Sequence, residues 1–171
     1  DVFLSDFVDD GNMQTFYNEF ERKDAAYLKL IQTYPLGYNK DISHKIASVP
    51  PGIKYRVGVG LALWNKDILL ENIITGQSAW EMEKSGLLGE NLKENQTYSI
   101  NYYYSGSPPF TFVHGVIKGA WIRNSIKFLI NEGFGNFLKN RPVLGMYDYL
   151  YMRLFGLLMF FFKKINFKWR L

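Results

Sequence analysis

Cysteine is absent from this chain of 171 residues, and its absence excludes two classes of protein. A chain without thiols forms no disulfide framework and no thiolate metal site, which removes a zinc ribbon and a thiol enzyme. The sequence also contains no P-loop, no GxGxxG after a strand, no GxSxG and no HExxH. These missing motifs count against NTPase and hydrolase functions.

Long apolar runs and targeting signals are also missing. The uncharged segment LFGLLMFFF at 154–162 has nine residues, whereas a helix that crosses a bilayer needs about 20. The first residues, DVFLSDFVDD, have neither the basic start nor the apolar run of a signal peptide, and they begin without Met. We therefore expect the chain to be truncated at its N-terminus.

The residues that are abundant favour one compact core with many rings. The hydrophobic content of 47% suits a globular domain. Aromatic residues make up 18% of the chain, which predicts either a ring-lined site or contact with a membrane. The net charge of +4 is concentrated near the C-terminus. Because the rings elsewhere do not alternate with a basic stripe, we do not expect nucleic-acid binding.

Hydrophobic spacing, caps and turn residues predict alternating helices and strands, and hence an α/β fold with a mixed sheet. We expect the region 32–55, rich in Pro, Gly and Asn, to be a long surface loop, and the apolar strand at 56–64 to be central in the sheet. The other expected elements are helices at 11–23, 66–74 and 121–132, with strands at 25–31, 98–104 and 111–117.

The segment Ser78-Ala79-Trp80-Glu81-Met82-Glu83 carries the sharpest local signal. Ser-x-x-Glu is a capping box, so it places Trp80, Glu81 and Glu83 at the start of a helix. A carboxylate there can accept the proton of an attacking hydroxyl, and a Trp ring can hold the C–H face of a sugar. The alternative is structural: Glu81 only completes the capping box, and Glu83 is a solvated helix residue.

Several segments in this order resemble a group of bacterial glycosyltransferases of the GT-A type. The resemblance covers residues 1–142 and rests most on LWNKD at 63–67 and SAWEME at 78–83. It implies that the chain is the C-terminal part of a GT-A-like domain, with a mixed sheet flanked by helices. It also implies sugar transfer from a nucleotide sugar to a saccharide or lipid-linked acceptor, in the synthesis of surface polysaccharide.

By position, the resemblance gives Glu81 or Glu83 the role of catalytic base and Trp80 a place in the acceptor pocket. Asp1 would be the last member of an acidic motif that holds a divalent metal, and oxygen ligands of this kind suit Mg²⁺ or Mn²⁺. The nucleotide-binding strands that precede this motif in the family are missing here. We therefore expect the chain alone to be an incomplete enzyme.

Four further residues have open roles. His114 is a second candidate metal ligand, because some enzymes of this type place a histidine near the C-terminus on the metal, but a lone imidazole also serves structural roles. Arg56 and Lys118 could bind a diphosphate or be solvated charges at a sheet edge. His44 lies in the expected loop and has no partner that the sequence identifies.

Residues 143–171 form an expected amphipathic tail of aromatic and basic residues. Its apolar segment at 154–162 is followed by Lys163, Lys164, Lys168 and Arg170, a composition that favours anionic headgroups on the cytoplasmic leaflet. A helix packed on the core is the alternative. The leading hypothesis is therefore a cytoplasmic enzyme peripheral to the inner face of the cell membrane, and the alternative function is a non-catalytic carbohydrate-binding or membrane-peripheral module.

Overall fold

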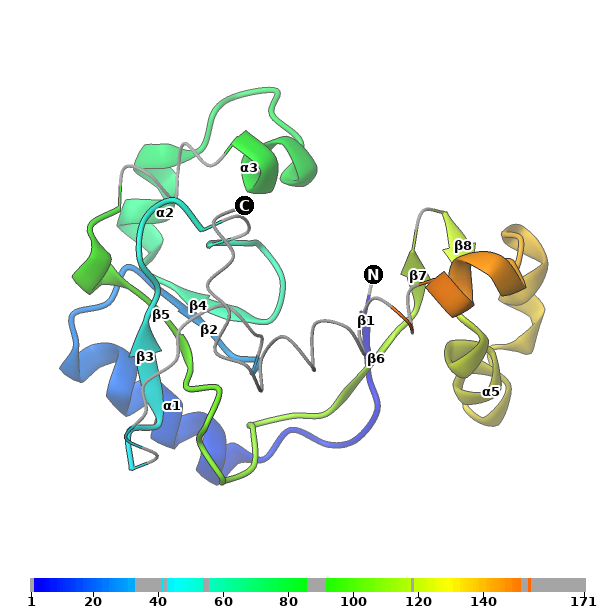
Figure 1. Ribbon diagram of the computed structural model, residues 1–171, viewed down its shortest axis with the longest axis horizontal. Coiled ribbons are helices and arrows are strands. Elements are labelled where there is room, and N and C mark those ends of the chain that lie inside the picture. The colour runs from blue at the N-terminus through cyan, green and yellow to red at the C-terminus, as the bar shows by residue number, and fades with distance from the viewer. Residues whose placement is uncertain are drawn as a thin grey trace. The chain divides into compact units, whose positions relative to one another are not determined.

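The computed structural model describes residues 2–32, 41, 43–53, 56–85, 92–117, 119–151 and 154 (Figure 1). It confirms the coarse fold class, because helices and mixed sheets occur together. The chain divides into two compact units: Val8–Phe110, here called the sheet unit, and Asp1–Phe7 with Thr111–Leu171, here called the terminal unit.

A four-stranded mixed sheet organises the sheet unit, with the strand order β3-β5-β2-β4. Its strands are β2 (Tyr27–Lys29), β3 (Ile46–Ser48), β4 (Ala62–Trp64) and β5 (Thr97–Ile100). The central pair, β2 and β5, is parallel, and both outer pairs are antiparallel. Tyr27 and Lys29 lie two positions apart on β2, so their side chains point to the same face of the sheet.

Helix α1 (Asp10–Arg22) covers one face of this sheet, as the spacing of its apolar residues predicted. Phe16 and Phe20 are buried against Leu28 and Ile100. The helix begins where the Asp9 carboxylate accepts a hydrogen bond from the Asn12 amide. It ends at Arg22, and Asp24, whose φ is positive at 47°, turns the chain toward β2.

Helices α2 (Lys66–Asn72) and α3 (Ala79–Ser85) lie on the opposite side of the sheet from α1 (Figure 1). A second buried cluster there joins Tyr27, Val57 and Met82, with Trp64 and Ile68 packed against it. Asn65 caps α2 as predicted, because its side-chain oxygen accepts from the amides of Asp67 and Ile68. The unit is thus layered helix, sheet, helix.

Two predictions about the sheet are wrong. The strand expected at 56–64 is reduced to β4, which lies at an edge rather than in the centre. Gly58 and Gly60 have no side chains to pack on a sheet, and Leu61 has a positive φ of 48°. The region expected to be a long loop contains β3, which pairs with β5 through the register Ile46↔Ile100.

The terminal unit begins with β1 (Val2–Leu4), which pairs antiparallel with β6 (Phe112–His114). The strand expected at 111–117 is split at Gly115, where the Phe3 ring occupies the space that a side chain would need. Beyond it, β7 (Val116–Ile117) and β8 (Ala120–Trp121) form a short hairpin. Phe3 stacks on the rings of both Trp121 and Phe128.

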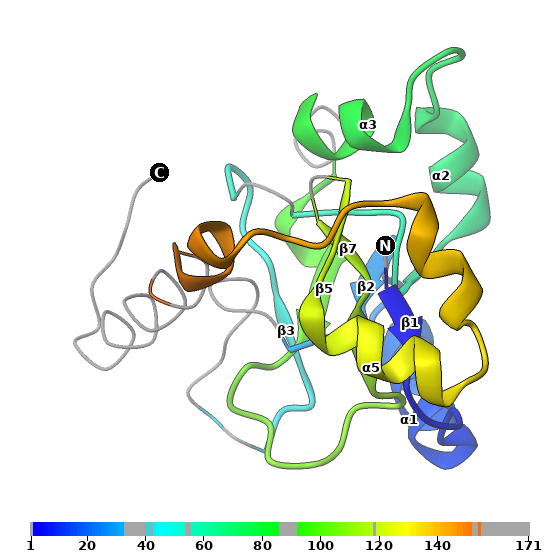
Figure 2. The same cartoon turned by 90° about the vertical axis from the view of Figure 1, so that its right-hand side faces the viewer.

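Helix α5 (Arg123–Asn131) confirms the prediction of a helix at 121–132 (Figure 2). Gly133, with a positive φ of 81°, follows its end. A 3-10 helix, η2 (Gly135–Asn140), and a helical segment at 146–151 follow. The boundary predicted at 142 stays a prediction. Residues 155–171, which carry most of the predicted tail, lie outside the described residues. Within the part that is described, no helix is long and apolar enough to cross a membrane.

Candidate functional site

Glu81 completes the predicted capping box. Its Oε2 accepts hydrogen bonds from the Ser78 amide at 2.8 Å and from the Ser78 hydroxyl at 2.6 Å. In return, the Glu81 amide donates to the Ser78 hydroxyl oxygen at 3.3 Å. The hydrogen bond from the Ser78 side chain lowers the pKa of Glu81, and a weaker base is less suited to take a proton. The described contacts therefore account for Glu81 as a cap.

Glu83 has a different environment from Glu81, although both belong to α3. Its Oε1 accepts a hydrogen bond from the Val59 amide at 3.2 Å. A Cβ atom added to Gly58 would lie 2.7 Å from the same oxygen, so only glycine leaves room for the carboxylate at this position. Glu83 is half-buried and reaches a backbone segment 24 residues earlier in the chain.

The charge of Glu83 affects the pKa values of Lys29 and Tyr27, which lie on the same face of β2. Burial lowers the pKa of the Lys29 amine, and the Glu83 carboxylate raises it part of the way back. Burial also raises the pKa of the Tyr27 phenol; a polar contact with the Gly58 backbone lowers it in part, and the Glu83 charge adds a smaller rise. A half-buried amine near a half-buried carboxylate is the kind of pair that functional sites often hold.

Tyr27 brings a buried polar atom to the same place. Its side chain is fully buried, and its hydroxyl makes no well-aligned hydrogen bond with any described residue. The Trp64 ring centroid lies 4.6 Å from that of Tyr27, and the Trp64 indole donates to the Gly58 carbonyl at 3.0 Å. We call Tyr27, Lys29, Gly58, Trp64 and Glu83 the β2–α3 site.

Sequence reasoning identified Glu83 of this site and missed Lys29 and Tyr27. The alternation of polar and apolar residues at 25–31 was the signal that could have found them, because it places Tyr27 and Lys29 on one face. Their proximity to α3 depends on how the chain returns to the sheet. No local pattern in the sequence contains that information.

Arg56 has a structural environment in the sheet unit. Only 3% of the residue is exposed. Its guanidinium donates to the carbonyls of Val49 at 2.7 Å, Leu92 at 2.6 Å and Lys93 at 2.8 Å. It is therefore not a solvated charge at a sheet edge, and these bonds account for the side chain without a diphosphate.

The remaining candidates lie apart from the β2–α3 site or outside the described residues. The backbone of Trp80 belongs to α3, but its side chain is not among the described ones, and Asp1 and Lys118 also lie outside the described part. His114 ends β6, where it meets Phe112 edge to face. Partial burial lowers the pKa of His114, which favours the neutral imidazole, the form that binds metals.

The described residues contain no cluster of candidate metal ligands. Across residues 2–32, 41, 43–53, 56–85, 92–117, 119–151 and 154, no three His, Asp or Glu side chains come together as ligands. His114 alone is too few for Mg²⁺ or Mn²⁺, which prefer several oxygen ligands. The metal stays a prediction that depends on Asp1.

Comparisons of this chain with protein-family models, with curated proteins and with solved structures found no match.

Proposed function

We propose that this protein is a glycosyltransferase, which moves a sugar from a nucleotide-sugar donor to a saccharide or lipid-linked acceptor, and that Glu83 is its catalytic base. The observation that carries the proposal is the different placement of the two acidic residues of SAWEME. Glu81 is bound in the capping box, whereas Glu83 turns toward Gly58 and Val59 beside Lys29. The order of segments that resembles GT-A glycosyltransferases supports the same function.

The chemistry asked of Glu83 is the removal of one proton. In an inverting displacement, the acceptor hydroxyl oxygen forms a bond to the anomeric carbon as the bond from that carbon to the diphosphate breaks. The hydroxyl proton passes to the Glu83 carboxylate, and the nucleoside diphosphate leaves with the electron pair. Oε1 of Glu83 is held by the Val59 amide, so Oε2 is the oxygen that would accept the proton.

The test compares Glu83→Gln with Glu81→Gln in a transfer assay. Membrane extract supplies acceptors, a panel of radiolabelled nucleotide sugars supplies donors, and Mg²⁺ or Mn²⁺ is added in parallel reactions. We expect Glu83→Gln to lower kcat by a factor of about 10² to 10⁴, the usual contribution of a positioned base. Glu81→Gln should lower stability and keep most of the turnover per folded molecule. Equal turnover of the Glu83→Gln and unmodified proteins would remove Glu83 from the mechanism.

A peripheral position on the inner face of the cell membrane belongs to the same proposal. Large apolar side chains of the terminal unit are exposed between residues 130 and 154, more than a solvated surface usually gathers in so short a segment. These residues are Ile130, Phe134, Phe137, Val143, Met146, Tyr147, Leu150, Tyr151 and Leu154. Exposed rings near a basic tail suit an anionic headgroup layer.

This apolar segment also favours the second candidate function, a membrane-peripheral or carbohydrate-binding module without catalysis. Cosedimentation with anionic phospholipid vesicles tests the membrane contact directly. We expect the double substitution Phe134→Ser and Phe137→Ser to weaken binding, and Ile73→Ser, at an exposed apolar residue of the sheet unit, to leave it unchanged. Vesicle binding without turnover on any donor would favour the module over the enzyme.

A further inference from the structure

The sheet unit has a pocket whose lining residues differ from those of the β2–α3 site. Its volume is about 470 Å³, and it lies where the end of α1 meets β3, β5 and the short 3-10 helix η1 (Glu94–Gln96). It is lined by Lys23, His44, Ser48 and Asn95, whose side chains carry hydrogen-bonding groups, and by the largely apolar residues Ile46, Ala47 and Tyr98. No Asp or Glu is among the described residues that line it.

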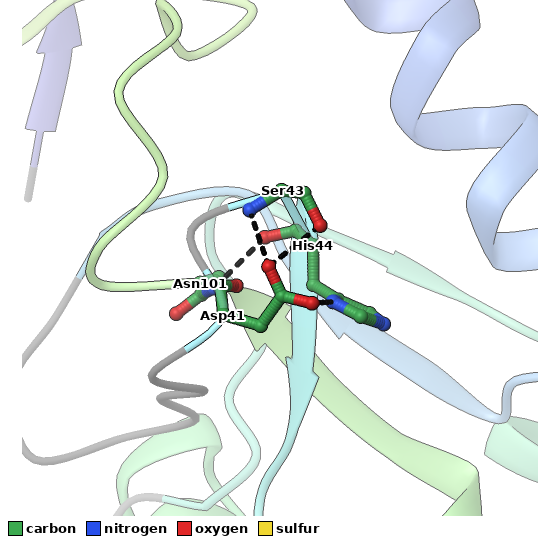
Figure 3. Close-up of polar contacts among 4 residues, drawn as sticks. All are labelled: Asp41, Ser43, His44 and Asn101. Atoms are coloured by element: carbon green, nitrogen blue, oxygen red, sulfur yellow. Dashed lines mark hydrogen bonds and ion pairs between the residues drawn. The ribbon is translucent and has the colours of Figure 1, made fainter.

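His44 is held in a defined orientation at this pocket (Figure 3). Its Nδ1 lies 3.0 Å from the Asp41 carboxylate. The other carboxylate oxygen of Asp41 accepts from the Ser43 hydroxyl at 2.6 Å and from the Ser43 amide at 3.0 Å. The hydrogen bond from the Ser43 hydroxyl lowers the pKa of Asp41, so the carboxylate stays ionised and accepts a hydrogen bond from Nδ1–H. Figure 3 shows the second ring nitrogen, Nε2, on the side of the ring away from Asp41.

A buried amide fixes the backbone that carries this Asp-His pair. Asn101 is fully buried at the end of β5, and its side-chain nitrogen donates to the carbonyls of His44 at 2.8 Å and Asp41 at 3.2 Å. Its side-chain oxygen accepts from the Tyr103 amide. A fully bonded buried amide rigidifies its surroundings, so the backbone that carries the pair is fixed, and the contact with Asp41 orients the imidazole on it.

We propose that this pocket binds a phosphate group, either free or esterified to a small molecule, through His44 Nε2, the Lys23 ammonium, the Ser48 hydroxyl and the Asn95 amide. A phosphate presents several strong acceptor oxygens, and the four side chains supply donors of four chemical types. Lys23 contributes a full positive charge, and no carboxylate in the described lining opposes it. The Asp41 carboxylate accepts a hydrogen bond from Ser43 and lies at the Nδ1 edge of the imidazole, opposite Nε2.

His44 can serve a phosphate in either protonation state. A protonated ring donates from Nε2 to a phosphate oxygen, and a neutral ring with its proton on Nδ1 accepts at Nε2 from the hydroxyl of a singly protonated phosphate. The apolar lining distinguishes two sources of the ligand. Ile46 and Tyr98 can contact the organic part of an ester, whereas inorganic phosphate leaves them uncovered.

The experiment uses the imidazole nitrogens as reporters. The chain has two histidines, His44 and His114. In long-range ¹H–¹⁵N spectra, the His44 signals report on the pocket and the His114 signals serve as an internal control in the same sample. Inorganic phosphate and glucose 1-phosphate are titrated separately at constant pH and ionic strength. We expect the Nε2 signal of His44 to move in a saturable way with a Kd on the order of 1 mM, while the His114 signals stay in place. Tighter binding of the ester would identify an organic phosphate as the ligand, and equal affinity would identify the free ion.

Matched charge variants decide whether the pocket is responsible. Lys23→Gln should weaken binding about tenfold, since it removes a charge-assisted bond to the phosphate. Lys66→Gln makes the same charge change at an exposed position on α2 outside the pocket, and it should leave the Kd unchanged. Equal weakening by both variants, or non-saturable movement of both histidines, would overturn the proposal, because either result indicates an unspecific salt effect.

Discussion

Arg56 is a buried polar side chain that links separate segments of the sheet unit through its guanidinium. Its three carbonyl partners come from the residue after β3 and from the segment before η1. We expect Arg56→Lys to lower the free energy of unfolding by about 2–4 kcal/mol, because one ammonium cannot reach three carbonyls in the fork geometry of a guanidinium. Denaturant unfolding measures the change. Arg123→Lys, at an exposed residue, is the control, and equal stability of the two variants would contradict the structural role.

Glu81 gives the protein a pH-dependent cap. Because the Ser78 hydrogen bond lowers its pKa in the folded state, the stabilisation is complete above the ordinary glutamate pKa of about 4.3. It is lost as the pH falls through the lowered value. We expect the difference in Tm between the unmodified protein and Glu81→Gln to shrink between about pH 5 and pH 3. Glu71→Gln, on the exposed surface of α2, is the control. A difference that stays constant over this range would refute the ionised cap.

The glycine-rich segment before β4 controls where α3 directs its carboxylate. At Gly58, a methyl group would meet Oε1 of Glu83, whereas at Gly60 it would meet nothing within 4 Å. Neither glycine has a positive φ, so alanine fits both backbones. We expect Gly58→Ala to turn the Glu83 side chain away at a cost below about 1 kcal/mol, since the end of a flexible side chain moves easily.

The electrostatic consequence of Gly58→Ala is measurable without any assay of activity. Glu83 raises the pKa of Lys29 against the effect of burial, so moving the carboxylate away should lower the Lys29 pKa further. Titration of the Lys29 side-chain signals by NMR measures it, with Gly60→Ala as the matched control. If both alanine variants kept the Lys29 pKa of the unmodified protein, Glu83 would not occupy the place assigned to it.

Local signals in the sequence were enough to predict the helices. The caps at Asn65 and Ser78 and the spacing of Phe16 and Phe20 act within a few residues, and the structure confirms each of them. The strands were harder to predict, because a strand is stabilised by a partner that is distant in the chain. β3 lies in a region whose Pro and Gly content indicated a loop, and its pairing with β5 joins Ile46 to Ile100.

The candidate sites show the same division between local and distant information. Glu83 was found through a local motif, but its contact with Val59 and its proximity to Lys29 arise from the return of α3 to the sheet. Asp41 and His44 are only three residues apart, yet their pairing depends on Asn101, about 60 residues later, which fixes the backbone of both. Such positions follow from the fold, and a one-dimensional pattern does not contain them.

Because the chain divides into two compact units, we expect the sheet unit to fold without the terminal unit. The segment Val8–Phe110 contains the whole four-stranded sheet and both buried clusters. Its two ends are adjacent, because the Asp9 amide donates to the Pro109 carbonyl at 2.7 Å and the Phe16 ring meets Tyr104 edge to face. A segment with its own core and neighbouring ends satisfies the usual conditions for a folding domain.

We therefore expect a fragment of residues 8–110 to fold cooperatively, with a free energy of unfolding of about 5 kcal/mol. Dispersed amide signals in ¹H–¹⁵N spectra and a single denaturant transition would establish this. A fragment of residues 8–100 is the matched control: it keeps every strand of the sheet but loses the Asn101, Tyr104 and Pro109 contacts, so its transition should come at lower denaturant. A fragment 8–110 with the narrow amide dispersion of an unfolded chain would show that the sheet unit needs the terminal unit to fold. The β2–α3 site and the phosphate pocket both lie within residues 8–110, so a folded fragment should also keep the His44 response to phosphate.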